Sequence, residues 1–167
     1  MAAFPERVYW DSCAWIALIS NEKAMRSDGT FEDRGALCRG VVARAEKGDL
    51  EIFTSALTLV EVNKTTQGET NPEADTIRDF FENDYIAIVS LDRQAGEPGR
   101  ELMRKGYSKL KPLDASHLAA AAIASVTEMH TFDDKLLALD GKIDKADGTR
   151  LRICKPSMGG PRLPLID

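Results

Sequence analysis

Four acidic residues stand where the predicted secondary structure changes, and as a set they have the chemistry of a divalent-cation site. Asp11 follows the strand-like stretch RVYW, and Asp133 follows the strand-like stretch EMHTF. Asp114 lies in the first turn of a helix predicted to begin at Pro112, and Glu61 interrupts the apolar series of another helix. A carboxylate among apolar neighbours is costly unless it is paired or bound to something.

The chemistry that such acids support is phosphodiester cleavage. Hard cations such as Mg²⁺ and Mn²⁺ bind oxygen ligands, and Mg²⁺ commonly uses a few carboxylates together with substrate phosphates. Carboxylates gathered without a cation would repel one another and raise some of their pKa values. With one or two cations among them, they can position a water for in-line attack while a cation stabilises the leaving oxygen.

Each acid also has a plain structural alternative. Asp11, Asp114 and Asp133 stand where a helix N-cap or a first-turn acid is expected, and for any one of them alone that role is the simpler interpretation. Glu61 could pair with Lys64, three residues further along its helix. The acids therefore indicate a site only as a set, and Asp11 could be a cap, a cation ligand or both.

Strand-like and helix-like patterns alternate along the chain. The predicted strands are residues 7–10, 50–55, 85–91, 128–132 and 151–155, and the predicted helices are residues 12–20, 31–48, 56–67, 72–84, 92–109, 112–126 and 134–139. This alternation predicts an α/β fold with a central, mostly parallel sheet covered by helices on both faces. Ligands of such sheets collect beyond the carboxyl ends of the strands, where Asp11 and Asp133 are predicted to lie.

The composition is that of one globular domain, residues 1–167, in which the Pro/Gly-rich residues 156–167 form a surface tail. Hydrophobic residues make up 43% and charged residues 29% of the chain, which excludes a disordered or fibrous protein. The formal charge of -5 argues against nonspecific coating of nucleic acid, although carboxylates that hold cations would themselves make a nuclease acidic. No membrane helix or signal peptide is predicted, so we expect a cytoplasmic protein.

The cysteines and tryptophans are predicted to be structural residues. Cys13, Cys38 and Cys154 lack the spacing of a disulfide framework or a zinc site, so we expect buried thiols. Trp10 and Trp15 are predicted to pack in the core.

The two histidines and the basic residues 100–111 each have a functional and a structural interpretation. His117 and His130 have no Ser/His or Cys/His pattern around them, so both are interpreted as structural. Residues 100–111, RELMRKGYSKLK, could follow an RNA backbone while Tyr107 stacks on a base, but a solvated helix face is at least as good an interpretation.

Four stretches resemble, in order, the motifs of PIN-domain ribonucleases: VYWDSCAWIAL, FTSALTLVEVNK, PLDASHLAAAA and MHTFDDKLLAL. Each stretch is short, but together they span roughly residues 7–139, most of the chain. The resemblance implies a three-layer α/β/α PIN fold and an RNA-cleaving Mg²⁺ or Mn²⁺ site on Asp11, Glu61, Asp114 and Asp133.

The resemblance also implies partners. Small PIN proteins are often the toxin of a VapBC-type toxin–antitoxin pair, frequently dimeric and silenced by a partner peptide, which suggests an RNA substrate, an antitoxin protein and a homodimer. The chain departs from the family pattern in the length of segment 21–49 and in its tail. Asp134 competes with Asp133 as the fourth ligand, and the pattern Thr131-x-Asp133 favours Asp133. Ser12 and Thr131 could hydrogen-bond the carboxylates or the substrate.

Two other functions compete with the predicted endoribonuclease. A catalytically silent PIN-fold module that binds RNA or regulates a partner would be expected to have lost an acid, whereas all four matching positions are acidic. An Asp-based phosphoryl-transfer domain would show paired acids or D-x-D after its first strand, where this chain has Asp11-Ser12-Cys13.

Overall fold

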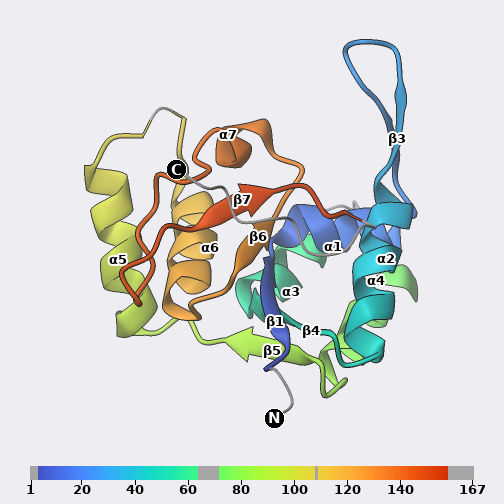
Figure 1. The fold of residues 1–167 in the computed structure, drawn as a ribbon, viewed down its shortest axis with the longest axis horizontal. Helices are drawn as coiled ribbons and strands as arrows, with labels where there is room; N and C mark the ends of the chain where they lie inside the picture. The colour runs from blue at the N-terminus through green and yellow to red at the C-terminus, as the bar shows by residue number, and fades with distance from the viewer. Residues whose placement is uncertain (1–3, 64–71, 108, 158–167) are drawn as a thin grey trace.

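A computed structural model describes residues 4–63, 72–107 and 109–157, and its centre is a five-stranded parallel sheet (Figure 1). The strands are β1 (Glu6–Trp10), β4 (Leu50–Ser55), β5 (Ile86–Val89), β6 (Glu128–His130) and β7 (Arg152–Cys154). Their order is β5-β4-β1-β6-β7, and every neighbouring pair is parallel. The carboxyl ends of these strands therefore lie along one edge of the sheet, which is the edge predicted to carry the site.

Helices cover both faces of the sheet: α1 (Ser12–Ile19), α2 (Arg34–Glu46), α3 (Leu57–Asn63), α4 (Pro72–Phe81), α5 (Arg93–Arg104), α6 (Pro112–Ile123) and α7 (Asp134–Leu137). Val8 and Trp10 of β1 belong to a core formed with α1, α2, α3 and α4. Tyr9 belongs to a second core formed with α5, α6, α7 and the strands β6 and β7. Because successive side chains of a strand point to opposite faces, β1 contributes to both cores, and the predicted three-layer α/β/α fold is confirmed.

Aspartates fix the starts of four helices. Asp11, Asp33, Asp92 and Asp133 are the N-caps of α1, α2, α5 and α7, and each side chain accepts a backbone N–H of the following turn. Such a cap satisfies a donor that the helix itself cannot pair and contributes about 1 kcal/mol. The structural role that the sequence offered for Asp11 and Asp133 is therefore present.

A hairpin that the sequence did not predict projects from the body beside the start of α2 (Figure 1). Strands β2 (Lys23–Met25) and β3 (Phe31–Asp33) pair antiparallel around a turn that contains Gly29, whose φ is 82°. The helix predicted from residue 31 begins instead at Arg34, because Asp33 caps it through the Ala36 N–H. This hairpin lies within segment 21–49, the segment whose length departs from the family pattern.

Other predictions have mixed outcomes. Trp10 and Trp15 are fully buried, as predicted, with ring centroids 4.9 Å apart. None of the three cysteines forms a disulfide, and Cys13 alone among them is only half-buried. The Glu61–Lys64 pair and most of the tail, from residue 158 onward, fall outside the described residues. Within the described ranges, no helix has the length and apolar character needed to cross a membrane.

Candidate metal centre at the carboxyl edge of the sheet

Asp11 lies directly after β1, with only 2% of its surface exposed. Its Oδ1 accepts the Ala14 N–H at 3.2 Å, and its Oδ2 accepts the Thr131 hydroxyl at 2.5 Å. Burial is the main cause that raises the pKa of Asp11, while the nearby His117 and the hydrogen bonds from Thr131 and Ala14 act in the opposite direction. Both hydrogen bonds come from neutral donors, and each oxygen keeps a second lone pair that can bind a cation.

Asp133 is connected to Asp11 through a single hydroxyl group. Thr131 follows β6, donates its hydroxyl proton to Asp11 and accepts the Asp133 N–H at 3.1 Å. The Asp133 carboxylate then accepts the Lys135 N–H at 2.9 Å as the cap of α7. Asp134 is exposed and faces a different cavity, next to the β2–β3 hairpin. The supporting role predicted for Thr131 therefore has a geometric basis.

Glu61 on α3 reaches α6 through a buried histidine. The Glu61 Oε2 lies 2.6 Å from His117 Nε2, and His117 Nδ1 lies 2.8 Å from the Tyr9 hydroxyl. An ionised carboxylate only accepts, so Nε2 carries the proton, and in a neutral imidazole Nδ1 then accepts the hydroxyl proton of Tyr9. Burial, reinforced by the charges of Asp11 and Glu61, raises the pKa of Tyr9, so this hydroxyl stays protonated.

Asp114 occupies the first turn of α6, where its Oδ2 accepts the Lys111 N–H at 3.0 Å. It is half-buried. Residues three apart lie on the same face of a helix, so Asp114 shares a face of α6 with His117, which contacts Glu61. Asp114 is thus one helical turn from His117, whereas Asp11 and Asp133 are connected to each other through the Thr131 hydroxyl.

The other three predicted acids all act electrostatically on one side chain, the Cys13 thiol of α1. Its pKa is raised to about 12, first by burial and then by the charges of Asp11, Asp133, Glu61 and Glu22. These carboxylates come from the end of β1, the end of β6, the helix α3 and the segment after α1. The carboxyl edge of the sheet is therefore strongly negative around Cys13, which is the environment that a divalent cation would neutralise.

Sequence reasoning missed three groups at this edge. His117, interpreted from the sequence as structural, holds Glu61, and Tyr9, placed from the sequence only in a strand, contacts His117. The signal for His117 was available, because it stands three residues after Asp114 on the same helix. Glu22 gave no signal, since it lies in a polar segment between predicted elements. Only the folded chain brings Glu22 to Cys13.

A second group of ligand-type residues lies on β6 and β7. Glu128, His130 and Cys154 place their ligand atoms within 4.8 Å of one another, and the described residues contain no other group of three this close. The Trp10 Nε1–H donates to His130 Nδ1 at 3.1 Å, so the imidazole proton is on Nε2, 3.0 Å from Glu128 Oε2. A protonated Nε2 cannot bind a cation, and Arg152 Nε lies 3.8 Å from the same carboxylate. We interpret this group as a buried polar network.

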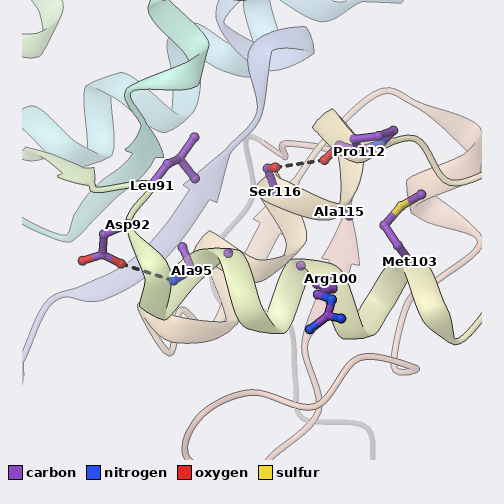
Figure 2. A pocket seen from close by; sticks show the side chains of 10 residues that line it. Leu91, Asp92, Ala95, Arg100, Met103, Pro112, Ala115 and Ser116 are labelled. Atoms are coloured by element: carbon purple, nitrogen blue, oxygen red, sulfur yellow. Dashed lines mark hydrogen bonds between the residues drawn. The ribbon is translucent and has the colours of Figure 1, made fainter.

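The cavity between α5 and α6 is the next candidate site, with a volume of about 260 Å³. In Figure 2, the Ser116 hydroxyl donates to the Pro112 carbonyl at 2.9 Å, and Asp92 accepts the Ala95 N–H at 3.3 Å. Its polar wall groups therefore make hydrogen bonds within or at the start of their own helices. Most of the remaining wall is small or apolar, so the cavity has one carboxylate, that of Asp92, and not the set of carboxylates that a divalent cation needs.

The basic run at residues 100–111 behaves more like a solvated face than an RNA track. Arg100 and Arg104 lie 3.7 and 3.3 Å from glutamates one turn earlier on α5, and all of these side chains are more than half exposed. Tyr107 packs against the second core and donates its hydroxyl to the Lys142 carbonyl at 3.5 Å. This contact turns the tyrosine toward the body of the protein.

Comparisons with known proteins agree with this architecture. No functionally curated protein matches the sequence. Among solved structures, the chain is similar to VapC20 of Mycobacterium tuberculosis, described as a toxin that cleaves the sarcin–ricin loop. The TM-score is 0.58 at 16% sequence identity, with 76% of this chain and 90% of that chain covered, so the likeness concerns the fold. The PIN domain model matches residues 8–142, most of the chain, and the protein therefore belongs to the PIN-domain family.

Proposed function

We propose that this chain is a metal-dependent endoribonuclease that hydrolyses RNA phosphodiester bonds. The predicted ligands of Mg²⁺ or Mn²⁺ are Asp11, Glu61, Asp114 and Asp133. The observation that carries the proposal is the buried Asp11 carboxylate at the carboxyl edge of the sheet, which the Thr131 hydroxyl connects to the backbone of Asp133. Membership of the PIN-domain family, whose members are typically metal-dependent nucleases, supports the same conclusion.

The donor set fits a hard divalent cation. All four predicted ligands offer carboxylate oxygens, which suit Mg²⁺ and Mn²⁺ better than softer metals. Asp11 is a buried carboxylate whose hydrogen bonds come from neutral groups, so a cation would offset the cost of its charge. A bound cation would supply a water of lowered pKa and stabilise charge on the phosphate.

The residues around the acids orient them. Thr131 fixes one Asp11 oxygen and the backbone of Asp133, which sets the spacing between the ends of β1 and β6. His117, itself hydrogen-bonded to Tyr9, holds Glu61 Oε2 and thereby directs the carboxylate. Partners that orient ligands in this way commonly change metal affinity by 10- to 100-fold when they are removed.

The test is cleavage of labelled single-stranded and structured RNA by the purified protein with Mg²⁺, with Mn²⁺ and with EDTA. Asp133→Asn and Asp134→Asn form a matched pair, since the two residues are adjacent but only Asp133 is one of the four predicted ligands. We call these four residues, Asp11, Glu61, Asp114 and Asp133, the acidic set. We expect Asp133→Asn to lose cleavage, and Asp134→Asn to keep most of it. Equal activity of wild type and Asp133→Asn would point to a contaminating nuclease and reject the assigned site.

The same site suggests a toxin with an antitoxin partner. The support is the likeness to VapC20, which is described as an RNA-cleaving toxin. A short reading frame encoding a DNA-binding protein next to this gene, whose product suppresses the cleavage on mixing, would bear this out. Metal-dependent RNA cleavage without such a neighbour would make the protein a housekeeping nuclease. RNA binding without any cleavage would favour the catalytically silent module instead.

A further inference from the structure

The β2–β3 hairpin encloses a cavity that neither the sheet nor the acidic set requires. Its volume is about 310 Å³, and residues of the hairpin line it together with Arg34, Asp134 and Lys155. Three separate parts of the chain therefore meet there: the hairpin with the start of α2, the start of α7 and the segment after β7. Figure 1 shows the hairpin extending outward from this region.

Glu32 in the cavity wall forms ion pairs with three basic side chains. This side chain is only 2% exposed, and its Oε2 accepts from Arg26 Nη2 at 2.8 Å and from Lys155 Nζ at 2.8 Å. Its Oε1 accepts from Arg34 Nε at 3.0 Å. Burial would raise the pKa of Glu32, but the hydrogen bonds from these three cations outweigh it and lower the pKa to about 2. One permanently ionised carboxylate thus fixes three positive groups.

The three cations retain donors for a further anion. An ammonium group has three protons and a guanidinium has five, so Lys155 and Arg26 do not exhaust their N–H groups on Glu32. Two aspartates, Asp28 and Asp134, also line the cavity, but both are exposed to solvent. Asp28 is already engaged by the Thr30 N–H and hydroxyl, at 2.9 and 2.6 Å. Exposed charges are screened more strongly than the half-buried Lys155.

The cavity adjoins the candidate metal centre. Asp134 in its wall directly follows a predicted cation ligand. Arg34 lies over the Phe132 ring, 4.8 Å from its centroid, and pairs with Glu22 at 2.9 Å. Glu22 is one of the carboxylates whose charge acts on Cys13. The Arg34–Glu22 ion pair therefore lies between the cavity and the acidic edge.

We propose that this cavity binds a phosphate group of the RNA substrate, beside the phosphodiester that is cleaved, through Arg26 and Lys155 and with Glu32 as the positioning residue. This inference rests on the proposed function. Cations whose tips are held by a shared carboxylate are preorganised, so they lose little freedom when a phosphate binds. Phosphate contacts position a nucleic acid without reading its sequence.

The test measures RNA binding without cleavage. A fluorescently labelled single-stranded RNA is titrated with protein in EDTA, and the dissociation constant is read from fluorescence anisotropy over a range of salt concentrations. We expect Arg26→Gln and Lys155→Gln each to weaken binding about 3- to 10-fold and to reduce the salt slope by about 0.7, the value for one contact to a single strand. The matched control is Arg93→Gln on α5, whose side chain is 91% exposed and far from the hairpin.

Glu32→Gln separates positioning from bulk charge. Removing a negative charge would by itself strengthen RNA binding. Loss of the Glu32 carboxylate should instead weaken RNA binding, because Arg26 and Lys155 are no longer held in position. Melting temperatures confirm that each variant is folded. RNA affinities that are unchanged in Arg26→Gln and Lys155→Gln, or reduced equally in Arg93→Gln, would overturn the proposal.

The outcomes distinguish this inference from the proposed function. If wild type cleaves RNA with Mn²⁺ but the cavity variants bind normally, the nuclease stands and the phosphate cavity is rejected. If wild type never cleaves RNA but the cavity variants bind it more weakly, the cavity stands as a phosphate site for bound RNA and the nuclease is rejected.

Discussion

Two groups of ligand-type residues lie at neighbouring strands of the same sheet, and they differ in how their protons are arranged. In the acidic set, Asp11 accepts from a backbone amide and a hydroxyl, and both of these donors are neutral. In the network on β6 and β7, His130 and Arg152 both face Glu128, so side chains of the protein itself compensate the charge of that carboxylate. The network is the group whose ligand atoms lie within 4.8 Å of one another, yet the acidic set is the group for which we propose a cation.

The difference teaches that proximity alone does not make a metal site. A cation needs lone pairs and uncompensated negative charge, and both can be read from hydrogen-bond partners. Trp10 settles the matter for His130 because an indole can only donate. The same reasoning explains why His117 serves the acidic set as an orienting group and not as a ligand.

The largest expected effect is on RNA cleavage. Asp11→Asn should lower the rate with Mn²⁺ by at least about 100-fold, because it removes a predicted ligand while Asn can still cap α1. Glu128→Gln, the matched change in the network, should leave the rate within about three-fold. The measurement is the initial rate on a labelled RNA, and similar losses in both variants would erase the distinction between the two groups.

The next effect is on cation affinity. His117→Leu removes the group that holds Glu61 and should weaken Mn²⁺ binding about 10-fold, since orienting partners have effects of this size. His130→Leu should leave the affinity unchanged once the variant is shown to be folded. Quenching of Trp10 and Trp15 fluorescence by Mn²⁺ reports the affinity without any need for turnover. If the Mn²⁺ affinity changed only in His130→Leu, the cation would have to be assigned to the network on β6 and β7 instead.

A smaller effect concerns stability without a cation. Asp11→Asn should raise the free energy of unfolding in EDTA by about 1 kcal/mol, because a buried carboxylate kept for function is a stability cost. Glu128→Gln should lower it by about 1–3 kcal/mol, because the amide offers one acceptor oxygen where the carboxylate offers two, and its NH₂ group then faces one of the donors His130, Cys154 and Arg152. Urea unfolding of the three proteins measures both values, and a destabilised Asp11→Asn would contradict the first.

The smallest effect is a pH dependence. The pKa of folded Asp11 is raised above the ordinary value of 3.8, so between these two values the folded state holds more protons than the unfolded state. Stability in EDTA should therefore fall as pH rises through this range. The advantage of Asp11→Asn should be absent near pH 4 and grow toward pH 7. Unfolding curves at several pH values that keep a constant gap between the two proteins would exclude Asp11 as the cause.

Much of the fold followed from local patterns. The alternation of apolar strands with helices predicted the five strands of the parallel sheet, and the Pro112 and Asp114 signals predicted the start of α6. The β2–β3 hairpin was missed because its strands are three residues long, which is too short for a period-two pattern. The end of α5 was placed late, at residue 109 instead of Arg104, because helical spacing continued past the turn at Gly106.

The sequence by itself determined where the acids stand: each lies at a strand end or on a helix near the carboxyl edge, and the short-range rules of periodicity and capping are enough to place it there. Only the tertiary structure decided what surrounds them. Thr131 reaches Asp11 across 120 residues of sequence, and His117 reaches Glu61 across 56. Such contacts depend on how β1, β6 and α6 pack against one another, and no local pattern encodes that packing.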